Sequence, residues 1–175
     1  PVLIERGTRH VAKVKLYTEE QIGRDYVYVP RSAFIMGRDR DAYPATARSD
    51  PFVEDFFIAK YEVTCEQYLE FLNDRACHDM EKAWARCPRG AARGGQYWQR
   101  SEDRLVLLPG MEKWPVLAIS WNDAEEYARW ATRRARERGE HATYRLPSTI
   151  EWEKGARGTD GRAFPWGNHF DWSFA

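Results

Sequence analysis

A proline followed directly by a helix-capping pattern, near the C-terminal end of the chain, constrains the fold most. Pro147 should end an extended stretch, because proline lacks an N–H and disfavours helical geometry in the residue before it. Ser148 and Glu151 have the spacing of a capping box, in which each side chain accepts from the other residue's backbone N–H. A short helix should therefore begin after Ser148 and end at Gly155 or Gly158, where left-handed geometry costs glycine little.

Two further helices are predicted from capping residues that precede apolar side chains at helical spacing. Thr64 and Gln67 form a second capping box, before a helix expected from residue 65 to about residue 74. Asn122 is the expected N-cap of a longer helix over residues 123–139. Arginines gather toward the end of that helix, where cations favour the helix dipole. A solvated helix face explains them better than an anion-binding patch does.

Short runs rich in aromatic and β-branched residues predict strands between these helices. Residues 26–30 and 33–37 should form an opening hairpin, and residues 52–64 return to strand character before the first long helix. A second hairpin is expected within residues 96–108. Residues 114–121 are apolar enough to predict a buried strand. Strands and helices of this length indicate an α+β protein.

Composition excludes several classes of protein. The 175 residues suffice for one domain with a core, and the 27 basic residues balance the 27 acidic ones. This balance argues against a nucleic-acid partner. No apolar run has the length of a membrane-spanning helix, and no N-terminal targeting pattern is present, so we expect no membrane segment and a cytoplasmic location. Because the sequence begins at Pro1, we interpret it as a fragment of a longer polypeptide.

Aromatic residues make up 14% of the chain, with eight tryptophans among them. They could form a surface on which a sugar or another ligand stacks. Alternatively, they could fill the core of an irregular fold, because large side chains bury the most apolar area per residue. We favour the core interpretation.

The three cysteines do not predict a catalytic or metal site. Cys65 lies in the first turn of a predicted helix and should be a small buried residue. Cys77 and Cys87 flank an irregular segment and could form a disulfide in an oxidising compartment. With His78 they offer at most three soft ligands, at a spacing that zinc modules do not use. We therefore assign no catalytic and no metal residue.

One polar cluster remains as a candidate binding site. Asn168, His169 and Asp171 follow the Phe164–Asn168 turn, which contains the sequence Pro-Trp-Gly. Their side chains could contact a ligand or an ion. The alternative is a loop whose polar groups bond to one another.

Several of these motifs together resemble the formylglycine-generating-enzyme/sulfatase-modifying-factor (FGE-sulfatase) family. They are the capped block over residues 144–153 with its Pro-Trp-Gly turn, the segment 115–130, and the strand-into-helix segment 52–72. The resemblance implies a C-type-lectin-like fold with short strands, about three helices and long irregular loops. It places an FGE-sulfatase-like domain at residues 26–175, after an extended N-terminal segment or linker over residues 1–25, and it implies that the domain stops before the family's C-terminal part.

The same resemblance bears on the chemistry. Enzymes of the family oxidise a sulfatase cysteine to formylglycine with molecular oxygen, and two thiolates in their C-terminal part hold copper(I), a soft cation. The family's calcium ligands also lie beyond the Pro-Trp-Gly turn. None of the three cysteines here corresponds to the copper ligands. The resemblance therefore implies no cofactor within this chain, and calcium or copper only together with the C-terminal part.

A second resemblance concerns the front of the chain. Residues 16–23, leading into residues 26–30, resemble the entry to this domain in bacterial proteins where it follows a serine/threonine protein kinase domain. The first hypothesis is therefore a non-catalytic binding or sensor domain in a kinase-linked signalling protein, with an unknown protein or small molecule as its ligand. The alternatives are the N-terminal part of a formylglycine-generating oxidase and a variable ligand-display protein.

Overall fold

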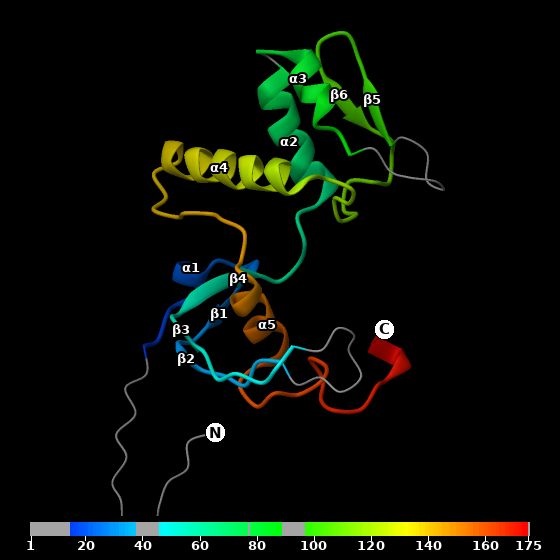
Figure 1. Cartoon of the computed structure of the whole chain (residues 1–175). Helices are drawn as coiled ribbons and strands as arrows, with labels where there is room; N and C mark the ends of the chain where they lie inside the picture. Colours follow the sequence, from blue (N-terminus) through cyan, green and yellow to red (C-terminus); the bar gives the residue numbers. More distant parts are fainter. Residues whose placement is uncertain (1–14, 38–45, 77, 89–96, 175) are drawn as a thin grey trace, which may run out of the picture. The chain divides into compact units, whose positions relative to one another are not determined.

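The computed structural model describes residues 15–37, 46–76, 78–88 and 97–174, which fall into two compact units (Figure 1). Unit 1 combines the chain up to Lys60 with the segment from Pro147 onward, and unit 2 spans Tyr61–Leu146. Short helices and two-stranded antiparallel sheets occur in the described parts of the chain. The predicted α+β class with short strands is confirmed.

An interrupted antiparallel ladder forms the sheet of unit 1. Strand β1 (Tyr26–Val29) pairs with β4 (Phe56–Ala59), and β2 (Ser32–Ala33) pairs with β3 (Phe52–Val53). The register continues across the two pairs, and the break falls at Pro30, which has no N–H to donate. The predicted hairpin between the first two strands is therefore wrong, because both strands pair with residues 52–59 instead.

Two capped helices complete unit 1. Helix α1 (Glu19–Ile22) begins with a capping box formed by Thr18, a short helix that the sequence did not predict. Helix α5 (Thr149–Arg157) begins with the predicted capping box, in which the Ser148 hydroxyl accepts from the Glu151 N–H. It ends at Gly158, whose positive φ of 71° is a conformation that glycine adopts at little cost. The prediction of this helix is confirmed at both ends.

Unit 2 is a small helical unit with one hairpin. Helices α2 (Cys65–Ala76) and α3 (Met80–Ala85) lie beside β5 (Trp98–Arg100) and β6 (Leu105–Leu107), with α4 (Trp121–Glu137) against α2 (Figure 1). The antiparallel pairing of β5 with β6 confirms the predicted second hairpin. The side chain of Asn73 ties α2 to β6, because its amide donates to the carbonyl of Leu105 and accepts from the N–H of Leu105.

Aromatic side chains fill the core of unit 2. Tyr68, Phe71 and Trp98 are at most 1% exposed, and Trp130 joins them from α4. Neighbouring rings lie 5.3–6.1 Å apart in tilted or edge-to-face arrangements, which aromatic pairs prefer. The core interpretation therefore holds for these rings, whereas Trp114 and Trp121 of the same unit are 57% and 65% exposed.

The segment before α4 differs from the prediction. Residues 114–121 form no strand but only a bridge between Thr64 and Pro115. Two backbone bonds flank this bridge, from the N–H of Cys65 to Trp114 and from the N–H of Val116 to Val63. Ala118 then takes a left-handed φ of 57°, which breaks the pleat. Helix α4 then begins two residues earlier than expected, with Ser120 rather than Asn122 as its N-cap.

Candidate functional site

The predicted polar cluster lies on a tight loop in unit 1. Phe164 and Gly167 exchange two backbone hydrogen bonds, of 2.8 and 3.0 Å, and thereby close the Pro-Trp-Gly turn. Gly167 has a φ of 143°, a conformation that side chains rarely adopt. The side-chain oxygen of Asn168 accepts from the backbone N–H of Ala163 at 3.1 Å, so it holds the loop together.

Asp171 is also used within its own loop. Its Oδ1 atom accepts from the backbone N–H and the hydroxyl of Ser173, at 2.9 and 2.7 Å. These bonds from Ser173 stabilise the carboxylate and lower the pKa of Asp171. The carboxylate thus caps a 3-10 helix, η1 (Trp172–Phe174). An acceptor oxygen with two donors already bound has little capacity left for a ligand.

His169 contributes its backbone carbonyl to the hydrogen bonds of the loop. Its carbonyl accepts from the indole N–H of Trp166 at 3.1 Å, and the residue is exposed. The loop therefore brings the three predicted residues together, but two of their side chains serve the loop itself. Their contact with a ligand stays a prediction.

Aromatic residues stand among the polar residues of this loop. From the sequence we expected the aromatic residues of the chain to fill its core. Rings on this loop and on η1 contact one another on the surface of unit 1. We call this set the aromatic face, and it consists of Phe164, Trp166, Phe170, Trp172 and Phe174. No member is buried.

The described cysteines lie in the core of unit 2. Cys65 is 1% exposed, and its sulfur lies 3.8 Å from the carbonyl oxygen of Pro115. Burial raises the pKa of the Cys65 thiol, which disfavours the thiolate that copper(I) requires. Cys87 is buried in the same core, and the predicted disulfide between Cys77 and Cys87 involves a residue outside the described ones. The described thiols do not fit the family's copper centre.

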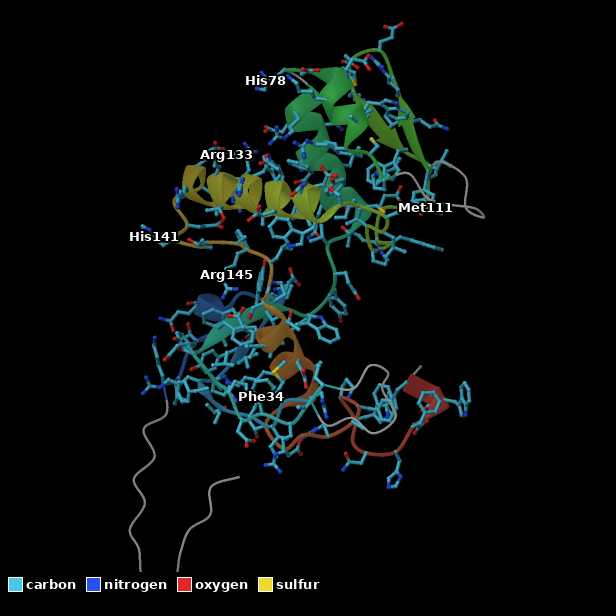
Figure 2. All side chains as sticks on the ribbon, in the orientation of Figure 1. Phe34, His78, Met111, Arg133, His141 and Arg145 are labelled. Carbon is cyan, nitrogen blue, oxygen red and sulfur yellow. The ribbon has the colours of Figure 1, made fainter. Side chains whose placement is uncertain are left out.

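Histidines do not gather into a site in the described parts of the chain. His78 and His141 lie on separate parts of unit 2, and both are exposed (Figure 2). His169 belongs to unit 1, and His10 lies outside the described residues. Among the residues that the structure describes, no group of three or more His, Cys, Asp or Glu side chains could hold a metal ion.

A surface hollow on unit 2 is a second candidate, which the sequence gave no reason to expect. Its volume is about 280 Å³, and Tyr61, Glu62, Thr64, Lys113 and Pro115 line it. The cation at its rim is neutralised, because Lys113 forms an ion pair with Glu66 at 2.6 Å. The other charged group that lines the hollow is the carboxylate of Glu62.

The arginines of α4 behave largely as a solvated helix face. Arg129 pairs with Glu125 and Glu126, and Arg134 pairs with Glu137 at 3.0 Å. Arg133 projects from the same helix (Figure 2). Pairs of this kind support an exposed helix by a few tenths of a kcal/mol, about 0.2–0.5 each. They neutralise much of the charge that an anion would need.

Short paired strands, capped helices and the Pro-Trp-Gly loop define an α+β protein of the FGE-sulfatase class. The family model of the "Sulfatase-modifying factor enzyme 1-like domain" matches residues 13–174. The chain belongs to this family.

Curated relatives include both active and inactive members. The formylglycine-generating enzyme of Thermomonospora curvata is 30% identical over 179 residues, covering 85% of this chain and 54% of that protein. The "Inactive C-alpha-formylglycine-generating enzyme 2" of Mus musculus is 31% identical over 170 residues, covering 82% of this chain and 51% of that protein. The chain thus spans about half the length of these relatives.

A kinase is also among the relatives. The serine/threonine-protein kinase pkn1 of Chlamydia caviae is 27% identical over 176 residues, covering 98% of this chain and 25% of that protein. The predicted resemblance to a kinase-associated subgroup is thereby confirmed. None of the helices in the described residues is long and apolar enough to span a membrane. The predicted domain limits at residues 25 and 26 stay a prediction.

Proposed function

We propose that this chain is a non-catalytic binding module of the FGE-sulfatase family, in a bacterial signalling protein linked to a serine/threonine kinase. The observation that carries the proposal is the position of Cys65. Its thiol packs among the aromatic rings of unit 2, and its raised pKa keeps it protonated. A residue in this position contributes to the core and does not act as a redox thiol.

The kinase link rests on the extent of one alignment. The alignment with pkn1 covers 98% of this chain but only 25% of pkn1, so pkn1 has room for further domains. The mouse relative is named an inactive enzyme, which supports a role for this fold without oxidase chemistry. Function depends on the site that a fold carries, and the fold itself does not decide it.

Binding is proposed to use the surface of unit 1 around Asn168, His169 and Asp171, with a protein or a small molecule as the ligand. The side-chain oxygens of Asn168 and Asp171 bond within the loop, whereas His169 contributes its backbone carbonyl and its side chain is exposed. Replacing His169 by alanine should weaken such binding without lowering stability, because the residue is exposed.

The second candidate is the N-terminal part of a formylglycine-generating oxidase. The 30% identity to the Thermomonospora curvata enzyme, over 85% of this chain, favours it. In this case copper(I) and its thiolates would have to come from polypeptide outside the described residues. Calcium, too, is proposed only together with such a part.

One assay separates the two candidates. The complete product of the gene that contains this sequence is incubated with copper(I), oxygen and a cysteine peptide from a sulfatase, and aldehyde formation is followed by mass spectrometry. The Thermomonospora curvata enzyme is the positive control. The proposal predicts no aldehyde, together with ATP-dependent phosphorylation of a generic protein substrate by the same gene product. Aldehyde formation would establish the oxidase instead.

A further inference from the structure

Three aromatic rings of unit 1 gather outside the loop that carries Asn168. Tyr28 in β1 and Phe57 in β4 are directly paired across the strands, so their side chains lie on the same face of the sheet. Tyr17, from the segment before α1, lies against both, with its ring centroid 4.7 Å from that of Tyr28 and 5.1 Å from that of Phe57. We call these three rings the ring platform.

The ring platform and helix α5 lie on opposite faces of the sheet. A Cβ atom added at Gly155 of α5 would lie 3.4 Å from the side chain of Ile58. Because Ile58 follows Phe57 in the same strand, the two side chains point to opposite faces. Phe57 is 40% exposed, and both tyrosines of the platform are partly exposed. The platform therefore leaves ring surface accessible to a ligand.

A carboxylate beside the rings decides which charge the ring platform can bind. The hydroxyls of Tyr17 and Tyr28 both donate to the Oδ2 atom of Asp55, at 3.0 and 3.3 Å. A phenol that donates to a carboxylate is polarised, so that its ring carries more negative charge. The negative faces of aromatic rings attract cations. The rings and the carboxylate together favour a cation and disfavour an anion.

An ammonium group of the chain itself already contacts the ring platform. The Nζ atom of Lys15 lies 4.6 Å from the centroid of the Tyr17 ring, within the range of a cation–π contact. A hydrogen bond with Tyr17 raises the pKa of Lys15, and the charge of Asp55 adds to this effect. Lys15 is exposed, and a cation–π contact at an exposed site is weak. A second ammonium group can therefore compete with Lys15.

We propose that the ring platform and Asp55 form a binding site for a small primary alkylammonium compound, and that Lys15 fills this site when no ligand is bound. Such a compound reproduces both contacts that the Lys15 ammonium makes, over the ring of Tyr17 and beside the carboxylate. The site shares no residue with the surface around Asn168, His169 and Asp171. It goes beyond the binding module proposed above, and its test does not depend on the aldehyde assay.

Fluorine NMR at position 57 tests the proposal. Para-fluorophenylalanine replaces Phe57 in the complete product of the gene that contains this sequence, and n-butylammonium chloride is the probe. The controls are n-butanol, a neutral molecule of the same shape, and sodium chloride. We expect a saturable shift of the fluorine signal with n-butylammonium alone. An equal shift with n-butanol overturns the proposal.

Removing the competing cation gives a sharper test. Lys15→Met keeps the apolar stem of the side chain and vacates the site. The dissociation constant of n-butylammonium should then fall roughly two- to fivefold, the range expected for an exposed cation–π contact. The control is Lys82→Met, because this lysine of unit 2 is 79% exposed and its loss changes the net charge equally. An unchanged affinity in Lys15→Met, or no saturable shift in that variant, overturns the proposal.

The carboxylate has a matched control in its neighbour along the chain. Asp55→Asn removes the counter-charge and should weaken binding of n-butylammonium at least twofold, whereas Glu54→Gln, at an exposed residue, should not. Equal affinities in these two variants contradict the proposal. If Asp55→Asn does not fold, the Lys15→Met comparison still decides, because Lys15 is exposed.

Discussion

The ammonium group of Lys154 lies 3.3 Å from the carbonyl oxygen of Val53, in the interior of unit 1. Lys154 is only 2% exposed, although it stands in the middle of the capped helix α5. It also donates to the carbonyls of Pro30 and Ser32, at 2.7 and 3.2 Å. The lysine therefore bonds the carbonyls at the break in the strand ladder, where Pro30 leaves the pairing incomplete.

Replacing Lys154 by methionine should destabilise unit 1. Burial lowers the pKa of Lys154, but its bonds to three carbonyls compensate for the buried charge. Methionine keeps the apolar stem and leaves these acceptors without a donor, at a cost of about 3 kcal/mol. Urea unfolding of both proteins gives this difference. Lys82→Met, at a side chain 79% exposed, is the control and should change stability by less than about 1 kcal/mol. An equal loss of unfolding free energy in the two variants would show that the buried bonds of Lys154 do not stabilise unit 1.

Glu153→Gln should also destabilise unit 1. The Glu153 carboxylate accepts from the N–H of Gly37 at 2.8 Å and pairs with Arg157 at 2.7 Å. Both charged side chains are nearly buried, so neutralising one leaves the other without its counter-charge and costs about 3 kcal/mol. The control is Glu137→Gln, which disrupts an exposed pair with Arg134. Thermal unfolding should separate the two variants clearly, and a midpoint for Glu153→Gln that matches the control would refute this account.

The side chain of Asn73 should stabilise unit 2 about as much as Lys154 and Glu153 stabilise unit 1. Its amide group bonds both backbone groups of Leu105, a residue with no exposed surface. Asn73→Ala leaves a buried donor and a buried acceptor unsatisfied, at a combined cost of about 3 kcal/mol. Gln99→Ala is the control, because Gln99 is exposed on β5. Hydrogen exchange at the Leu105 amide provides a local readout, and it should accelerate only in the Asn73 variant.

Stability in acid should depend on Asp55. The Tyr17 hydroxyl donates to its carboxylate at 3.0 Å and the Tyr28 hydroxyl at 3.3 Å, which lowers the pKa of Asp55. Because the folded-state pKa lies below the unfolded one, the carboxylate stabilises the fold above its ordinary pKa. This stabilisation is lost as the pH falls through the lowered value. Urea midpoints measured across the acid range should therefore fall more steeply for the wild type than for Asp55→Asn. Parallel curves would exclude this role.

Capping residues in the sequence predicted where helices begin and end. The capping box at Ser148 and Glu151 gave the start of α5, because each bond of the box joins residues three apart, and Gly158 gave its end. Strand pairing depends on residues distant in sequence, so the partner of β1 could not be read from its own composition. The left-handed Ala118 was equally hidden, because alanine carries no indication of such geometry.

The candidate site was predictable only in its position. The spacing of Asn168 and Asp171 placed two acceptors on one loop, but nothing in it indicated that Ala163 and Ser173 would occupy them. The aromatic residues around them were predicted to lie in the core, because ring size predicts burial on average. Exposure of Trp172 depends on what packs beside it, and composition alone does not give that.

The reactivity of the Cys65 thiol tests the central claim most directly, namely that the described part of this chain contributes a core cysteine and not a catalytic one. The native chain is treated with iodoacetamide, and peptide mapping follows the modification of Cys65 over time. The account predicts that Cys65 reacts far more slowly than in the urea-unfolded chain, because alkylation has to wait for unit 2 to open. Modification of native Cys65 as fast as in the unfolded chain would contradict the account, because it would reveal an accessible thiolate.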